Sequence, residues 1–273
     1  MTDHYAVMGN PIAHSKSPRI HAAFASQTQQ DLDYTTILVE LGELKTAVDN
    51  FRKQGGHGLN ITVPFKTDAF AIADQHSERA LKAEAANTLV LNKDGSIFAD
   101  NTDGAGLVRD LTHNHGLTLR NKKILVLGAG GAVQGVLLPL LSEQPQQLVI
   151  ANRTSEKAVA LADKFSDSGS ISGGGFDNLD GEKFDLIING TAASLKGEVP
   201  AIPDDILANG GVCYDMMYSN EPTAFVQWGN EHRASQSLDG LGMLVEQAAE
   251  SFRLWRGVQP DTDPVINLLR QSA

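Results

Sequence analysis

Hydrophobic positions follow two alternating spacings along most of this chain. Short runs of adjacent apolar residues alternate with segments in which apolar side chains recur every three or four positions. The short runs predict buried strands, and the longer spacing predicts amphipathic helices. Because the two patterns follow one another repeatedly, we predict an α/β protein with largely parallel sheets covered by helices.

The first hundred residues predict one such series. We expect a hairpin turn at Asn92–Gly95, because Asn-Lys-Asp-Gly separates two short apolar runs, near 87–91 and 96–99. The other expected strands lie near 4–8, 33–39 and 57–63, and the expected helices near 18–29, 42–54, 65–73 and 78–84.

A second series of strands separated by helices is expected between residues 104 and 239. The stretch 166–175 is rich in serine and glycine, so we predict a mobile surface loop there. The expected strands of this series lie near 123–127, 147–151, 185–189, 211–215 and 235–237.

The last segment predicts a long amphipathic helix and a shorter one near 263–271. Since a series of five strands with their helices is already complete before residue 240, we expect these helices to return to the first domain. We thus predict domains at 1–103 and 104–239, a C-terminal segment at 240–273, and a ligand cleft between the two domains. The long helix is indicated by the spacing of Leu241, Leu244, Val245, Ala248, Ala249, Phe252 and Trp255.

Composition excludes several classes of protein. The formal net charge of −11 gives no basic surface for nucleic acid. A single cysteine, Cys213, excludes an internal disulfide and is expected to be a buried structural thiol. No stretch approaches the roughly 20 apolar residues of a membrane helix, and no Cys/His/Asp spacing indicates a metal site. We therefore expect a cytoplasmic protein without membrane or nucleic-acid partners.

A glycine-rich turn follows the apolar run 124–127. Its residues are Gly128, Ala129, Gly130, Gly131 and Ala132, and the third glycine of the full dinucleotide fingerprint is replaced by Val133. An ordinary strand–turn–helix junction would also explain such a turn. The strand before it, the helix after it and a second strand at the expected distance favour a pyrophosphate site at the helix N-terminus.

The second strand of this unit ends in a basic residue. Asn152, Arg153 and Thr154 follow the apolar run 148–150, and no carboxylate occurs before Glu156. An acidic residue at this place selects the ribose 2′-hydroxyl of NAD, whereas arginine suits the 2′-phosphate of NADP. We therefore predict that the site prefers NADP.

Two polar stretches in the first domain could carry chemistry. Asn60 and Thr62 alternate with apolar residues, Lys66 follows a strand-ending proline, and Asp103 closes a turn of short polar residues. A lysine and an aspartate that converge in a cleft can transfer a proton, although Lys66 could also be a solvated lysine and Asp103 a helix N-cap. Ser17 before Pro18 would be explained by a helix N-cap alone, but with Ser15 two hydroxyls lie beside a helix N-terminus, which suits a small anionic or hydroxylated ligand.

These stretches together closely resemble the shikimate dehydrogenase family, and the resemblance covers nearly the whole chain. The matching blocks are Gly9–Ile12, Ser15–Pro18, Asn60–Lys66, Ala86–Thr88, Asn101–Gly104, Gly128–Ala132, Asn152–Thr154, Tyr214–Met216 with Tyr218, and Asp239–Leu244 with Gln247.

The resemblance implies a role for each matching residue. Lys66 and Asp103 would be the catalytic dyad. The substrate would also be held by Ser15, Ser17, Asn60, Thr62, Asn87, Tyr218 and Gln247. The dinucleotide would be held by Glu78, Gly128, Ala129, Gly130, Gly131, Ala132, Asn152, Arg153, Thr154, Ser155, Glu156, Lys157, Thr191, Met216, Gly240 and Met243.

The implied reaction is the reversible NADPH-dependent reduction of 3-dehydroshikimate to shikimate, in the biosynthesis of chorismate and the aromatic amino acids. One alternative is a quinate/shikimate dehydrogenase that uses NAD or NADP, and another is an NADP-sensing protein without catalysis. A folate- or aldehyde-reducing enzyme would leave the two serines and Gln247 unexplained. The resemblance allows a monomer or a homodimer.

Overall fold

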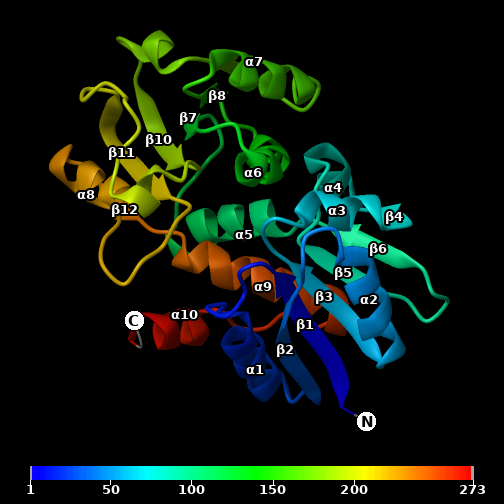
Figure 1. The fold of residues 1–273 in the computed structure, drawn as a ribbon. Coiled ribbons are helices and arrows are strands. Elements are labelled where there is room, and N and C mark those ends of the chain that lie inside the picture. Colours follow the sequence, from blue (N-terminus) through cyan, green and yellow to red (C-terminus); the bar gives the residue numbers. More distant parts are fainter. Residues whose placement is uncertain (1, 272–273) are drawn as a thin grey trace. The chain divides into compact units, whose positions relative to one another are not determined.

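The chain folds into two compact units. The computed structural model describes residues 2–271, so the last two positions of the predicted C-terminal segment lie outside it (Figure 1). One unit comprises Met1–Gly106 with Leu244–Leu269, and the other comprises Leu107–Met243 with the end of the chain from Arg270 onward. The helices α5 (Asp103–Arg109) and α9 (Leu241–Arg256) contribute residues to both units.

The first unit is built on a mixed sheet with the strand order β2-β1-β3-β5-β6-β4. Its β1 pairs in parallel with β2 and β3, whereas β5 is antiparallel to both β3 and β6. The strands are β1 (Asp3–Gly9), β2 (Leu32–Leu38), β3 (Gly56–Ile61), β4 (Gln75–His76), β5 (Thr88–Leu91) and β6 (Ile97–Asp100).

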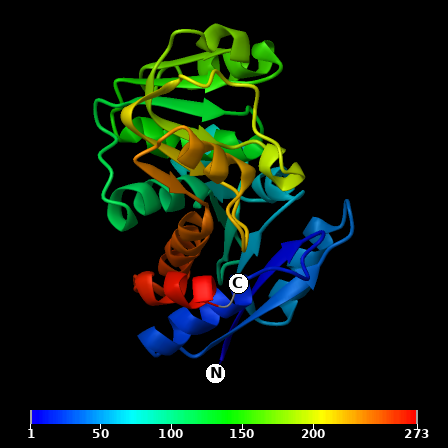
Figure 2. The same cartoon turned by 90° about the vertical axis from the view of Figure 1, so that its left-hand side faces the viewer.

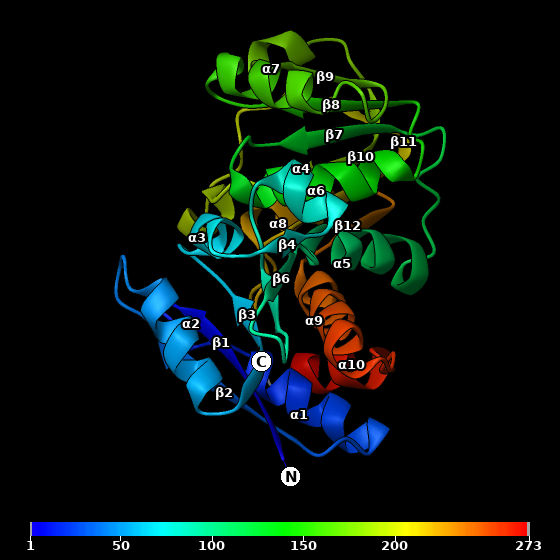
Figure 3. The same cartoon turned by 90° about the vertical axis from the view of Figure 1, so that its right-hand side faces the viewer.

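Alternate residues of β1 pack on opposite faces of this sheet. Ala6 and Met8 join one apolar cluster with residues of α2, whereas Tyr5 and Val7 join another on the opposite face. Figure 3 shows α1 and α2 on the two sides of β1. The helices that contribute to this unit are α1 (Ser17–Thr28), α2 (Leu44–Lys53), α3 (Lys66–Ala71), α4 (Glu78–Ala83), α9 and α10 (Asp263–Gln271).

The second unit has a wholly parallel sheet with the strand order β12-β11-β10-β7-β8-β9. This is the strand order of the doubly wound dinucleotide-binding fold, in which ligands bind at the carboxyl ends of the strands. The strands are β7 (Lys123–Leu127), β8 (Gln147–Ala151), β9 (Ile171–Gly174), β10 (Phe184–Asn189), β11 (Leu207–Asp215) and β12 (Gln236–Leu238).

Helices cover both faces of this second sheet (Figures 1 and 2). Val126 packs with Val136 of α6 on one face, and its neighbour Leu127 packs with Phe225 of α8 on the other. The helical segments of this unit are part of α5, a π-helical turn (Asp110–Asn114), α6 (Gly131–Ser142), α7 (Ser155–Lys164), short 3₁₀ turns (Phe176–Leu179 and Ala193–Lys196), α8 (Ala224–Glu231) and the start of α9. The predicted α/β class with Rossmann-type architecture is confirmed.

The prediction of a loop over 166–175 is wrong for residues 171–174, because Ile171–Gly174 forms the edge strand β9 beside β8, whereas 166–170 are turns and bends. A side chain at Gly173 would collide with the backbone of Ala158 in α7. Gly173 thus permits close packing of α7 on β9, although the composition of the segment 166–175 resembles that of a loop. The short strand β4 was not predicted either.

Within residues 2–271, none of the helices is both long enough and apolar enough to span a membrane. The cysteine behaves as the sequence predicts. Cys213 lies on β11 and is fully buried, and this burial raises the pKa of its thiol to about 12. It is therefore protonated and inaccessible at neutral pH.

Candidate active site

A lysine and an aspartate meet at the starts of two helices in the first unit. Lys66 is the first residue of α3 and Asp103 the first residue of α5. The Lys66 ammonium contacts Oδ2 of Asp103 directly. Their side chains are 26% and 12% exposed, so the pair is sheltered but reachable from solvent. The fold thus brings together Lys66 and Asp103, the two residues that the sequence singled out as a proton-transfer pair.

Asn87 holds the other oxygen of the aspartate. Its Nδ2 lies 2.8 Å from Oδ1 of Asp103 and 3.2 Å from Oε1 of Gln247. Its Oδ1 accepts a hydrogen bond of 2.8 Å from the backbone amide of Thr102. Since Asn87 precedes β5 and Gln247 lies on α9, one amide fixes the carboxylate against two distant parts of the chain.

A second buried polar cluster is centred on Asn60, near the end of β3. Its Oδ1 accepts a hydrogen bond of 2.7 Å from the Tyr34 phenol, and its Nδ2 donates to Oγ of Ser251 at 3.0 Å. Thr88 joins through a hydroxyl contact of 2.7 Å with Ser251. The sequence did not single out Tyr34, Thr88 or Ser251. Thr88 belongs to the matching block Ala86–Thr88 but was given no role, and Ser251 lies one helical turn after Gln247.

The two serines lie at the start of α1. The interpretation of Ser17 as an N-cap is wrong, because Ser17 is already the first helical residue and Lys16 occupies the cap position. Instead, Oγ of Ser15 accepts a hydrogen bond of 3.3 Å from the Ser17 amide. Burial raises the pKa of Tyr34 well above its usual range, partly opposed by a hydrogen bond with Ser17, so Ser17 adjoins the Asn60 cluster.

Thr62 follows β3 directly. Its amide donates to Met8 O at 2.9 Å, and its methyl group occupies the space that a side chain at Gly9 would need. Thr62 thus lies at the carboxyl ends of β1 and β3. Tyr218, the remaining predicted substrate residue, belongs to the second unit and lies in the segment after β11.

The glycine turn of the second unit has the backbone that a phosphate site needs. Gly128 has φ +105°, and a side chain there would lie 3.2 Å from Cγ2 of Thr191. No atoms surround the positions of added side chains at Gly130 and Gly131, and no side chain caps α6 at this fully described terminus. The bare helix N-terminus therefore suits a pyrophosphate group.

The basic segment lies next to this turn. The Gly128 amide donates a hydrogen bond of 2.8 Å to Ala151 O, which joins the turn to the end of β8. Asn152 closes the following bend through a hydrogen bond of 2.9 Å from its Nδ2 to Thr154 O. Arg153 itself is exposed. Thr154, Glu156 and Lys157 are also exposed and Ser155 is half-buried, around the start of α7.

A further group of predicted cofactor residues gathers at the carboxyl ends of β10, β11 and β12. A side chain at Gly240 would collide with the Met216 carbonyl, and the Gly240 amide donates to Met217 O at 3.0 Å. Met243 follows in the first turn of α9 and is buried. Glu78 differs from these residues, because it is an exposed residue of α4 in the first unit.

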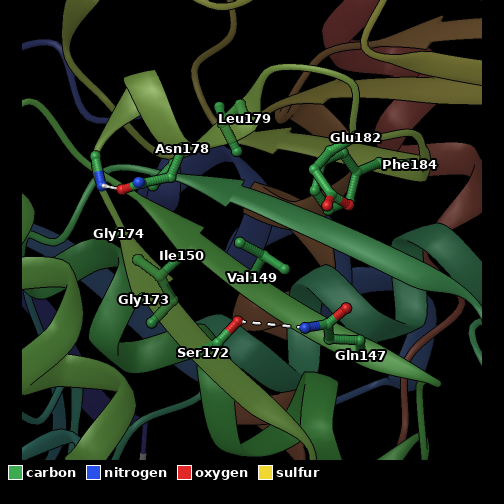
Figure 4. A pocket seen from close by; sticks show the side chains of 12 residues that line it. Gln147, Val149, Ile150, Ser172, Gly173, Gly174, Asn178, Leu179, Glu182 and Phe184 are labelled. Carbon is green, nitrogen blue, oxygen red and sulfur yellow. Dashed lines mark hydrogen bonds between the residues drawn. The ribbon is translucent and has the colours of Figure 1, made fainter.

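A separate hollow of about 160 Å³ runs along β8 and β9 (Figure 4). Its polar groups already interact within the unit, since Gln147 donates to Ser172 at 3.4 Å and Glu182 pairs with Lys123. None of the glycine-turn residues 128–132 lines it. Among residues 2–271, no three His, Cys, Asp or Glu side chains cluster as metal ligands do.

Three family models match the chain in succession. The shikimate dehydrogenase substrate-binding domain matches residues 7–89, shikimate/quinate 5-dehydrogenase matches 110–196, and the shikimate 5′-dehydrogenase C-terminal domain matches 240–270. Together the three matches cover more than half of the chain, and they follow the order of the predicted motifs.

Curated relatives are similar over almost their whole length. The shikimate dehydrogenase (NADP(+)) of Nitrosococcus oceani is 56% identical over 99% of this chain and 96% of its own. The protein of the same name from Methylococcus capsulatus is 59% identical over 98% of this chain and 96% of its own.

Solved structures of similar fold include members of the same family. An Ael1 enzyme from Pseudomonas putida superposes with a TM-score of 0.92 at 47% identity, covering 98% of each chain. The shikimate 5-dehydrogenase of Thermus thermophilus, solved with NADP(H) and shikimate, gives 0.88 at 29% identity and covers 100% of each chain. The chain therefore belongs to the shikimate dehydrogenase family, which confirms the resemblance seen in its motifs.

Proposed function

We propose that this protein catalyses the reversible NADP-dependent interconversion of shikimate and 3-dehydroshikimate. The observation that carries the proposal is the Lys66–Asp103 ion pair, with its second carboxylate oxygen held by Asn87. A cation fixed in this way has the arrangement that a proton-transfer group requires. The NADP(+) shikimate dehydrogenases at 56% and 59% identity support both the substrate and the cofactor.

The substrate would be held by polar groups that the fold already orients. The Asn60 cluster is fixed by buried hydrogen bonds from β2, β5 and α9. Pre-oriented hydroxyl and amide groups bind hydroxyl and carboxylate groups with little loss of entropy. The proposed substrate residues are Ser15, Ser17, Asn60, Thr62, Lys66, Asn87, Asp103, Tyr218 and Gln247.

Lys66 would transfer the proton. When bound, NADPH supplies the hydride that reduces the ketone. As negative charge develops on the carbonyl oxygen, the Lys66 ammonium stabilises it and donates a proton to that oxygen. In the reverse direction, the neutral amine accepts the proton of the substrate hydroxyl. Asp103 orients the amine in both directions through the ion pair.

The residues of the second unit fit NADP. The bare N-terminus of α6 would receive the pyrophosphate, and Arg153 and Lys157 would receive the 2′-phosphate because both are exposed beside the turn. Thr191, Met216, Gly240 and Met243 would surround the nicotinamide. The remaining proposed cofactor residues are Glu78, Asn152, Thr154, Ser155 and Glu156.

The proposal gives the two units different tasks. Residues 1–103 would bind the substrate and transfer the proton, and residues 104–239 would bind the dinucleotide. Within the segment 240–273, Gly240 and Met243 would serve the dinucleotide, and the part of α9 that carries Gln247 would serve the first unit, since Gln247 contacts Asn87. The last two residues of that segment lie outside the described part of the chain.

One assay tests this function and its alternatives. The purified protein is given shikimate or quinate with NADP⁺ or NAD⁺, and reduced dinucleotide is followed by absorbance. We expect turnover with shikimate and NADP⁺ to exceed the other three combinations. Comparable turnover of quinate, or of shikimate with NAD⁺, would favour the quinate/shikimate dehydrogenase, a name that the family model for 110–196 shares. Binding of NADP⁺ without any turnover would favour a sensing protein.

A further inference from the structure

A buried carboxylate lies at the carboxyl end of β11. Asp215 is the last residue of that strand, and its side chain is fully buried. The site residues discussed above include its neighbour Met216 but not Asp215. Burial raises the pKa of Asp215, and four hydrogen bonds oppose this effect.

Four donors converge on this carboxylate. Oδ2 accepts from the hydroxyls of Ser194 and Thr223, both at 2.6 Å. Oδ1 accepts from Nδ2 of Asn189 and from the Met217 amide, both at 3.1 Å. The carboxylate thus joins the end of β10, the 3₁₀ turn Ala193–Lys196, the segment after β11 and the N-cap of α8.

These hydrogen bonds extend to residues of the proposed nicotinamide site. With its Nδ2 donating to Asp215, the side chain of Asn189 presents its Oδ1 to Thr191. That oxygen accepts from the Thr191 hydroxyl at 2.7 Å and from its amide at 3.1 Å. The Met217 amide fixes the backbone between Met216 and Tyr218. Asp215 therefore precedes Met216 directly, reaches Thr191 through Asn189, and reaches the residue before Tyr218 through the Met217 amide.

Burying a carboxylate at the end of a strand costs desolvation free energy. An apolar residue of similar volume at the end of a buried strand avoids the desolvation of a charge and often stabilises at least as well. Aspartate offers something that an apolar residue lacks, because it accepts from fixed donors on several loops at once. Such a hub sets the geometry of the loops.

We propose that Asp215 is a positioning residue that sets the loops around the nicotinamide half of the dinucleotide site. This inference rests on the proposed function. The adenosine half of the site, at Arg153 and the end of β8, has no hydrogen bond to Asp215 among the described residues. Loss of Asp215 should therefore weaken one half of the site and spare the other.

The test compares two ligands by calorimetry. NADP⁺ carries both halves, whereas 2′-phosphoadenosine diphosphoribose lacks the nicotinamide ring. For Asp215→Ala, which leaves buried donors without an acceptor, we expect the affinity ratio of NADP⁺ to the fragment to fall roughly tenfold or more. We also expect kcat for shikimate to fall, while the affinity for the fragment stays close to that of the wild type.

Asp215→Asn is the conservative variant. Its amide can still accept from Asn189 and Met217 and can donate to the rotatable hydroxyls of Ser194 and Thr223. We expect its ratio of NADP⁺ affinity to fragment affinity to be closer to the wild-type value than that of Asp215→Ala. If Asp215→Ala does not fold, Asp215→Asn is the variant that is tested. In that case a ratio lowered about two- to threefold supports the proposal, and a wild-type ratio overturns it. The control is Asp185→Asn at the amino end of β10, where the carboxylate is 35% exposed.

Three outcomes distinguish this inference from the proposed function. If the wild type binds NADP⁺ and oxidises shikimate but Asp215→Ala keeps the wild-type ratio, the inference is overturned. Equal losses for NADP⁺ and for the fragment also overturn it, because they indicate general damage to the unit. A wild-type protein that binds no NADP⁺ refutes the proposed function instead.

Discussion

At the scale of single residues, the site depends on one cation held by one anion. We predict that Lys66→Ala lowers kcat for shikimate oxidation by a factor of about 10² to 10⁴, the usual contribution of a proton-transfer group. The affinity for NADP⁺, measured by fluorescence or calorimetry, should stay near the wild-type value, because the proposed dinucleotide residues other than Glu78 lie in the second unit.

Lys45→Ala is the matched control for this substitution. Lys45 pairs with Asp49 at 2.8 Å, but its side chain is 73% exposed on α2, and exposed ion pairs contribute little to stability. Its turnover should equal that of the wild type. Near-normal turnover of Lys66→Ala would remove Lys66 from the proposed role.

A buried histidine makes the stability of the first unit depend on pH. His21 is fully buried on α1 and stacks on Tyr34 with ring centres 4.1 Å apart. Burial lowers its pKa from 6.5 to about 3. Because the unfolded chain takes up this proton at a higher pH than the folded protein, stability is fully present above pH 6.5. It then falls by up to about 1.4 kcal/mol per pH unit towards pH 3.

The measurement is the free energy of unfolding in urea between pH 7 and pH 4.5. Other groups also titrate in this range, so the wild type is compared with His21→Phe, which keeps an aromatic ring against Tyr34. We predict that the free energy of unfolding of the variant falls less steeply with decreasing pH, by up to about 1.4 kcal/mol per pH unit, which corresponds to one proton. Exposed His14→Phe should keep the wild-type slope. Parallel curves for the wild type and His21→Phe would contradict the burial argument.

At the scale of elements, β9 shows how a close contact determines residue type. A side chain at Gly173 would overlap the backbone of Ala158, and backbone of α7 cannot move aside as a flexible side chain can. We predict that Gly173→Ala destabilises the protein by about 1–3 kcal/mol in urea unfolding. Ser172→Ala on the same strand should stay within about 0.5 kcal/mol. Equal stability of the two variants would show that α7 shifts without cost.

The same strand marks the limit of sequence-based prediction. The strands near 123–127 and 147–151 were predicted within a residue, because their apolar runs reflect burial on both faces of a parallel sheet. Strand β9 is an edge strand whose residues are all half-buried, and Gly173 is required by its contact with α7 rather than by any local sequence pattern. The apolar spacing within α7 and within β9 does not indicate the contact between Ala158 and Gly173.

The site divides in a similar way. Lys66 and Asp103 were found because each interrupts an apolar pattern and matches a family motif. Tyr34, Ser251 and Asp215 were given no role from the sequence, although Asp215 lies in the matching block Tyr214–Met216 and Ser251 lies one helical turn after Gln247. Their importance lies in hydrogen bonds between segments far apart in the chain. The Tyr34 phenol, for example, meets Asn60 at a sequence separation of 26 residues.

At the scale of the whole molecule, the two units carry separable recognition tasks under the proposed function. Arg153 belongs to the second unit, and the substrate residues other than Tyr218 belong to the first. We predict that Arg153→Ala raises KM for NADP⁺ about tenfold or more, since an arginine–phosphate contact is a charge-assisted bond. KM for shikimate at saturating NADP⁺ should change by less than about twofold.

The preference between dinucleotides provides the sharper readout. NAD⁺ has no 2′-phosphate for Arg153 to bind, so kcat/KM for NAD⁺ should hardly change, and the ratio of NADP⁺ to NAD⁺ should fall by the same factor as kcat/KM for NADP⁺. Arg120→Ala is the control, because Arg120 is also exposed but precedes β7, at the amino end of the same sheet. An unchanged ratio in Arg153→Ala would place the 2′-phosphate contact elsewhere, with Lys157 the next residue to test. A rise in KM for shikimate as large as that for NADP⁺ would contradict the division of tasks itself, because a loss confined to the adenosine end should not reach the substrate.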